Sequence, residues 1–127
     1  MAETSKCATI NIGQPQITIT INSVEIQRDY VTVNTIYKGE DLIKYMFCAN
    51  LTVSGGTPNL ITMKIYLGKD QNSLVEVGSG SIPGYSGTFR MCLSKENILG
   101  CNTTDDLLKK AGVENLTSCA YCVKVIW

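Results

Sequence analysis

The residues best able to do chemistry in this sequence are its six cysteines: Cys7, Cys48, Cys92, Cys101, Cys119 and Cys122. Two of them form a Cys-x-x-Cys motif near the end of the chain, in SCAYCVKVIW. A redox enzyme places such a pair where both thiols reach one substrate. Here polar and apolar residues alternate, which predicts a β-strand, and residues three apart in a strand lie on opposite faces with Cα atoms about 10 Å apart. A disulfide needs Cα atoms closer than about 7 Å, so we expect Cys119 and Cys122 not to bond to each other.

An even number of cysteines and the absence of histidine favour disulfides over a metal centre. The alternative is a four-thiolate zinc site built from Cys92, Cys101, Cys119 and Cys122. Such sites usually carry a second Cys-x-x-Cys motif, which this sequence lacks. We therefore predict no metal site and no cofactor. Disulfides imply an oxidising compartment or a hyperthermophilic host.

The pairing of the cysteines stays open at this point. Cys101 and Cys119 flank a predicted helix, so a bond between them would fasten that helix to the sheet. Cys92 and Cys122 could pair if their strands are neighbours, which would leave Cys7 and Cys48.

The residue types argue against an enzyme. Histidine, the commonest general base, is absent. The adjacent acids Glu40-Asp41 and Asp105-Asp106 are typical of a turn and of the first turn of a helix. We predict no catalytic residue.

Net charge and hydropathy exclude other classes. The 11 basic and 11 acidic residues balance, which argues against a protein that binds nucleic acid or an anionic membrane. No apolar run approaches the roughly 18 residues of a membrane-spanning helix. The opening residues, MAETSKC, lack the apolar core of a secretory signal, so we expect either that a signal has been removed or that the protein does not use that route.

Apolar alternation with a period of two residues dominates the chain and predicts an all-β protein. The strands expected are 7–12, 17–26, 30–37, 42–53, 61–67, 74–77, 89–93 and 119–127. A shift of the apolar phase near Ser23 indicates a β-bulge, and the glycine- and serine-rich stretch 78–87 is interpreted as a connection. One short helix is expected near 104–111, capped by Thr103 or Thr104. The pattern predicts a single Ig-like or jelly-roll β-sandwich of about seven to nine strands, formed by residues 1–127.

The N-terminal residues 1–21 are a candidate edge or donor strand. Their isoleucines alternate with polar residues in two runs separated by Gly13-Gln14-Pro15, and an apolar face of this kind must be buried somewhere. The candidate assembly residues are Ile10, Ile12, Ile17, Ile19 and Ile21. This strand either completes the sheet of its own chain or is donated to a neighbouring subunit.

Three Asn-x-Ser/Thr sequences are candidate glycosylation sites, at Asn50, Asn102 and Asn115. Surface glycans are therefore candidate modifications. The alternative is that these are ordinary Asn- and Thr-rich turns.

The middle of the chain resembles Ig-like extracellular fibre subunits. The segment YKGEDLIKYMFCAN, followed by Gly55-Gly56-Thr57-Pro58 and the strand 61–67, is similar in rhythm to biofilm fibres of the TasA/camelysin type and to archaeal threads and bundling pili. In those families the N-terminal strand completes the sandwich of the next subunit, so the resemblance implies a donor strand at about residues 7–21. The cysteines depart from the pattern of those families.

We therefore expect a structural subunit of an extracellular or cell-surface filament or pilus. Copies of the chain would be its partners, strand addition would join them and disulfides would stabilise them. One alternative is a virion protein, a capsid, turret or fibre component of a thermophile virus, which would explain an initial Met without a signal. The other is a carbohydrate-binding or adhesive module, which would need a cluster of exposed aromatic residues.

Overall fold

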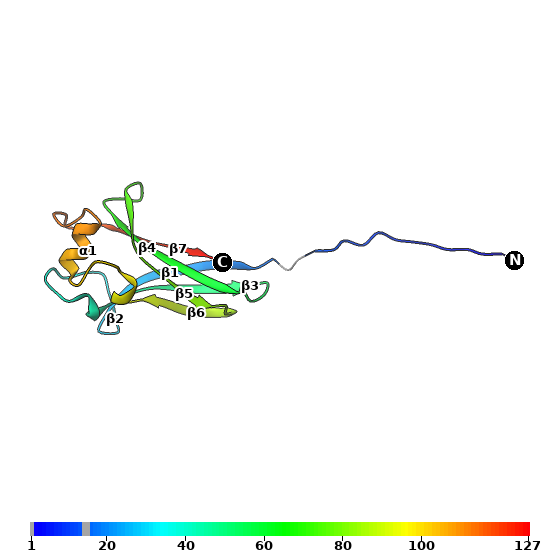
Figure 1. Ribbon diagram of the computed structural model, residues 1–127, viewed down its shortest axis with the longest axis horizontal. Helices are drawn as coiled ribbons and strands as arrows, with labels where there is room; N and C mark the ends of the chain where they lie inside the picture. Colours follow the sequence, from blue (N-terminus) through cyan, green and yellow to red (C-terminus); the bar gives the residue numbers. More distant parts are fainter. Residues whose placement is uncertain (1, 14–15) are drawn as a thin grey trace.

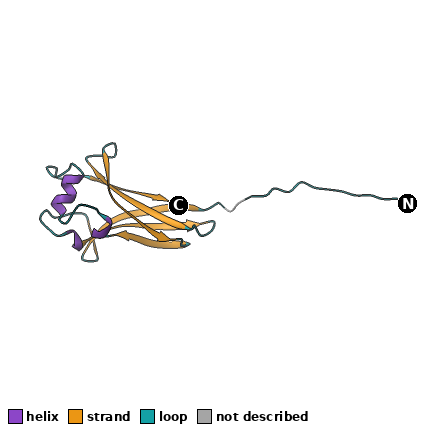
Figure 2. Cartoon of the chain, viewed as in Figure 1, coloured by secondary structure: helices purple, strands orange, loops and turns teal. Residues whose placement is uncertain are grey.

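The computed structural model describes residues 2–13 and 16–127, and most of these residues form a β-sandwich with one short α-helix (Figures 1 and 2). Its strands are β1 (Thr18–Arg28), β2 (Val31–Val33), β3 (Tyr45–Ser54), β4 (Leu60–Gly68), β5 (Leu74–Pro83), β6 (Gly87–Leu93) and β7 (Ala120–Ile126). One antiparallel sheet has the order β2-β1-β3-β6 and the other the order β5-β4-β7. The all-β sandwich predicted from the sequence is confirmed.

The core lies between the central strands of the two sheets. Alternate residues of β3 and β4 point inward and are almost completely buried: Tyr45, Phe47, Ala49, Leu51 and Val53 from β3, and Ile61, Met63, Ile65 and Leu67 from β4. Each large apolar side chain buried in this way stabilises the fold by about 1.5–3 kcal/mol. The period-two pattern of the sequence therefore fixes which face of each central strand is inward.

A β-bulge in β1 keeps its apolar residues on the inner face. The register with β3 shifts between Ile21 and Ser23, so Asn22 is the additional residue. Ile21 is paired with Leu51 before the bulge, and Val24 is paired with Ala49 after it. The bulge predicted near Ser23 is confirmed.

Three predicted elements have other bounds in the structure. The strand expected at 42–53 begins only at Tyr45, because 42–44 form a 3₁₀ helix. The strand expected at 30–37 is only Val31–Val33, and the expected connection 78–87 begins inside β5. Glycine at position 80 leaves room for two side-chain ends, because a Cβ there would lie 2.5 Å from Leu93 Cδ2 and 2.8 Å from Asn97 Nδ2. The glycines of this stretch thus permit a close approach between β5 and the segment after β6.

Two 3₁₀ helices, η1 (Leu42–Lys44) and η2 (Lys95–Asn97), precede β3 and follow β6. Helix α1 (Thr104–Lys110) forms where the sequence predicts it. The Thr103 side chain caps its N-terminus by accepting a hydrogen bond from the Asp106 backbone N–H, 3.2 Å away. Leu107 and Leu108 are buried, so the helix closes one end of the sandwich. No helix in the described ranges is both long and apolar enough to cross a bilayer.

Candidate functional site

The N-terminal segment 2–13 is the part of the chain that does not join the sandwich. It is extended and exposed throughout, and within the described chain no hydrogen bond joins it to the rest (Figure 1). Ile10 and Ile12 are 80 % and 92 % exposed. The prediction of a strand at 7–12 is wrong for the isolated chain because a strand needs a neighbour to pair with, and this segment has none. We call residues 2–13 the tail.

The five candidate assembly isoleucines separate into two groups. Ile17 and Ile19 pack against the core of their own sandwich, and Ile21 lies in β1. The start of β1 is held further by Trp127, whose Nε1 donates a hydrogen bond to the Ile17 carbonyl oxygen, 3.2 Å away. The tail isoleucines Ile10 and Ile12 are the most exposed of the five. Gln14 and Pro15, which join tail and sandwich, lie outside the described residues.

One side of the sandwich is open beside β1. Ile21 and Val24 point inward, as Ile19 does, but they are 37 % and 40 % exposed whereas Ile19 is 9 % exposed. Strand β2 pairs with β1 only from Ile26 to Arg28, so the earlier residues of β1 have a strand on one edge only. Strand β7 pairs with β4, and its other edge has no strand partner in the described chain. The three-stranded sheet is therefore one strand short of its counterpart on this side.

A groove of about 610 Å³ occupies this open side. We call it the side groove. Its apolar lining includes Val24, Ile26, Val33, Leu108, Leu116 and Tyr121. Burial raises the pKa of the Tyr121 hydroxyl, which donates a hydrogen bond to the Cys48 carbonyl oxygen at 3.3 Å. An apolar groove beside the unpaired edge of β7 can accept both the side chains and the backbone of an extended peptide.

The cysteines pair differently from the pairings considered above. Cys48 and Cys92 form a disulfide because they lie directly opposite each other on β3 and β6, with Cα atoms 4.1 Å apart. The pair Cys92–Cys122 is therefore wrong, since β6 and β7 lie in different sheets. Both bonded residues project from the outer face of their strands, but the sequence did not reveal that β3 and β6 are neighbours.

Four cysteines keep free thiols in the monomer, and the suggested bond between Cys101 and Cys119 is absent. Cys101 is buried, and burial raises the pKa of its thiol. Cys7 and Cys119 are exposed and Cys122 is half-buried. Cys119 and Cys122 are not bonded to each other, as the strand pattern predicts. Within residues 2–13 and 16–127, no three side chains of the metal-binding types come together.

The candidate glycosylation sites differ in accessibility. Asn50 is half-buried on β3, where its Nδ2 donates hydrogen bonds to Ser23 Oγ at 2.9 Å and to Glu25 Oε1 at 3.3 Å. A glycan on Nδ2 would displace these contacts, which argues against modification at Asn50. Asn102 and Asn115 are exposed beside α1, and they stay candidates.

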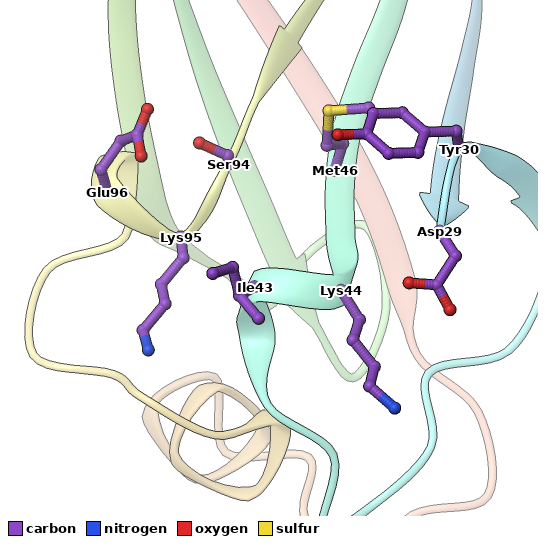
Figure 3. A pocket seen from close by; sticks show the side chains of 8 residues that line it. All are labelled: Asp29, Tyr30, Ile43, Lys44, Met46, Ser94, Lys95 and Glu96. Atoms are coloured by element: carbon purple, nitrogen blue, oxygen red, sulfur yellow. The ribbon is translucent and has the colours of Figure 1, made fainter.

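A smaller hollow of about 300 Å³ lies beside the turn between β1 and β2 (Figure 3). It is lined by Asp29, Tyr30, Ile43, Lys44, Met46, Ser94, Lys95 and Glu96. Lys44 and Lys95 extend on either side of Ile43 in this view. None of the charged side chains here is buried, so the hollow lacks the desolvated carboxylate that acid–base catalysis commonly uses.

The most convergent charged cluster holds the end of β1 to the loop before η1. Arg28 forms two hydrogen bonds with the Glu40 carboxylate, at 2.7 and 2.9 Å, and the buried Tyr45 hydroxyl donates to it at 3.2 Å. The Arg28 guanidinium, through these hydrogen bonds, holds the pKa of Glu40 below its ordinary value. The turn expected at Glu40 is present, since the Glu40 N–H donates a hydrogen bond to the Tyr37 carbonyl oxygen, and the Glu40 carboxylate is in addition the ion-pair partner of Arg28. The cluster is structural because every charged member is satisfied by another.

Comparisons with models of protein families, with curated proteins and with solved structures found no match to this chain.

Proposed function

We propose that this protein is a structural subunit of an extracellular filament, in which the tail of one copy enters the side groove of the next. The observation that carries the proposal is that two incomplete surfaces belong to the same chain. The tail exposes Ile10 and Ile12 with no backbone partner, and the side groove exposes Val24 beside the unpaired edge of β7. Added at the free edge of β7, the tail would give the short sheet its fourth strand.

Chain direction favours a neighbour over the tail's own sandwich. The C-terminal end of β7 lies beside the start of β1, where Trp127 contacts Ile17. A tail folded back into its own groove would therefore enter at that end and run parallel to β7. The tail of another copy is free to run antiparallel to β7, which is the slightly more stable pairing. In Figure 1 the tail runs away from the body along its long axis.

The assembly that follows is open-ended. Each copy offers one tail and one groove, so the contact joins two different surfaces and leaves a free surface of each kind at the two ends. Burying the tail isoleucines contributes about 1.5–3 kcal/mol each. The Cys48–Cys92 disulfide is consistent with an oxidising, extracellular setting. A fibre or shell on a virus particle would use the same contact.

The test compares charges placed on the two faces of the tail. In Ile10→Asp/Ile12→Asp the charges would enter the groove, and in Thr9→Asp/Asn11→Asp the same charges would face outward. Electron microscopy and sedimentation of the full-length chain should show filaments for the natural sequence and for the control pair, and only monomers for the isoleucine pair. Closed particles would favour the virion alternative instead. Monomers for all three proteins, or filaments that survive the isoleucine substitutions, would contradict the proposal.

A further inference from the structure

Three accessible thiols lie on the two surfaces that the proposed assembly brings together. Cys7 is on the tail, Cys119 is at the start of β7 and lines the side groove, and Cys122 is within β7. Cys101 is buried beside α1 and is out of reach. Each copy therefore carries one thiol on its tail and two beside its groove.

The alternation of side chains selects one of the two groove thiols. If Ile10 and Ile12 face into the groove, Cys7 faces outward, because successive residues of a strand point to opposite faces. On β7, Tyr121 and Val123 pack against the core.

Cys122, between those two residues, is on the outer face, where it is paired with Tyr66 of β4. Cys119 has the parity of the inner face and lines the groove. Among the thiols beside the groove, only Cys122 shares a face with Cys7.

The register that joins these cysteines also places the tail isoleucines correctly. In an antiparallel pairing with Cys7 opposite Cys122, the same spacing continued past the start of β7 at Ala120 places Ile10 beside Cys119 and Ile12 beside Thr117. Both of these partners line the side groove. The positions of the cysteines and those of the isoleucines are independent features of the sequence, and both fit the same register.

The molecule already contains a disulfide of the same kind. Cys48 and Cys92 are directly opposed on antiparallel neighbours, and their Cα atoms are 4.1 Å apart. An antiparallel tail strand beside β7 would give Cys7 and Cys122 the same relation, within the distance that a disulfide requires.

We infer that Cys7 of one subunit forms a disulfide with Cys122 of the next, so that the filament becomes a covalent chain; this inference rests on the proposed tail-in-groove assembly. The reaction is a thiol–disulfide exchange with a small-molecule disulfide such as oxidised glutathione. The two protein thiols lose two protons and two electrons and form one S–S bond, and the oxidant is reduced to two thiols.

The experiment incubates the full-length protein with oxidised glutathione, blocks remaining thiols by alkylation and separates the products on a denaturing gel without reductant. We expect a ladder of multimers that collapses to monomer when a reductant is added. Chymotrypsin cleaves after Tyr121 and so separates Cys119 from Cys122, and the cross-linked product should yield a peptide that contains Cys7 joined to residues 122–127. Cys7→Ser and Cys122→Ser should each remove the ladder.

Each other outcome overturns the inference in a recognisable way. A peptide that joins Cys7 to Cys119, together with a ladder that is kept in Cys122→Ser, would mean another register. Dimers that depend on Cys7 alone would mean a symmetric tail-to-tail bond. Filaments visible by electron microscopy without any covalent ladder would refute the disulfide and leave the proposed function standing. The absence of both would refute the disulfide and the proposed function together.

Discussion

The two sides of this sandwich differ in how completely their inward-facing residues are buried. On the side of β5 and β6, inward-facing Val77, Met91 and Leu93 are at most 3 % exposed. On the side of β1 and β7, inward-facing Ile21 and Val24 are 37 % and 40 % exposed. We call them the sealed side and the open side. Both border the same core, so the difference lies in what covers each edge.

The sealed side is covered by its own chain. After β6, the segment around η2 crosses to β5, and glycines on β5 let Asn97 and Leu93 approach closely. The open side has no such cover, since β2 is short and β7 has one strand partner in the described chain. An exposed sheet edge invites the addition of a strand unless it is covered or charged. The comparison therefore indicates that the open side is the surface available for assembly.

Removing residues 2–13 should have the largest effect. It should abolish assembly and leave the stability of the monomer unchanged. The tail makes no contact that stabilises its own sandwich, so the shortened protein should stay folded, with a Tm close to that of the full-length monomer, while filament formation is lost completely. Circular dichroism and sedimentation provide the two readouts. If the tail instead folds back into its own groove, the deletion will lower the Tm markedly, and the difference between the two sides will disappear.

The substitution Gly80→Ala should weaken the sealed side. The added Cβ would lie 2.5 Å from Leu93 Cδ2 and 2.8 Å from Asn97 Nδ2, so these two side chains must shift from their packed positions. Overpacking of this kind costs about 1–3 kcal/mol, which denaturant unfolding can measure.

Gly13→Ala is the matched control, because a Cβ at Gly13 meets no atom within 4 Å. That variant should unfold like the natural protein. Equal stability of the two variants would contradict the role assigned to Gly80.

Lowering the pH should reduce the free energy of unfolding that the Arg28–Glu40 cluster contributes, and this effect should be smaller than that of Gly80→Ala. The pKa of Glu40 is lower in the folded protein than its ordinary value, chiefly because of its hydrogen bonds with Arg28. Its contribution to stability is therefore complete above the ordinary carboxylate pKa and is lost as the pH falls through the lowered value. Glu40→Gln should be less stable than the natural protein at pH 7, and the gap should narrow at pH 3. A gap that is the same at both pH values would show that the charge of Glu40 contributes nothing.

The sequence predicts the sandwich because burial on one face leaves a period-two signature, and it predicts α1 because its caps are local. It does not predict the Cys48–Cys92 bond, since β3 pairs with β6 across 44 residues of chain. It also assigns a strand to residues 7–12, because alternation describes a surface that can pair and does not say whether a partner is present. The side groove is invisible in the sequence for the same reason, since it results from how the sheet edges meet.

The most direct test of whether the side groove accepts the tail supplies the tail as a separate molecule. A synthetic peptide of residues 2–13, kept reduced, is titrated into the protein that lacks those residues, and the Tm and amide exchange of β7 are measured. We expect saturable binding that raises the Tm and protects the free edge of β7, because a ligand of the folded state stabilises it.

The same peptide with Ile10→Asp/Ile12→Asp should not bind, and the one with Thr9→Asp/Asn11→Asp should. A folded protein that ignores the natural peptide at millimolar concentration, or that binds all three peptides equally, would contradict the claim that the side groove accepts the tail.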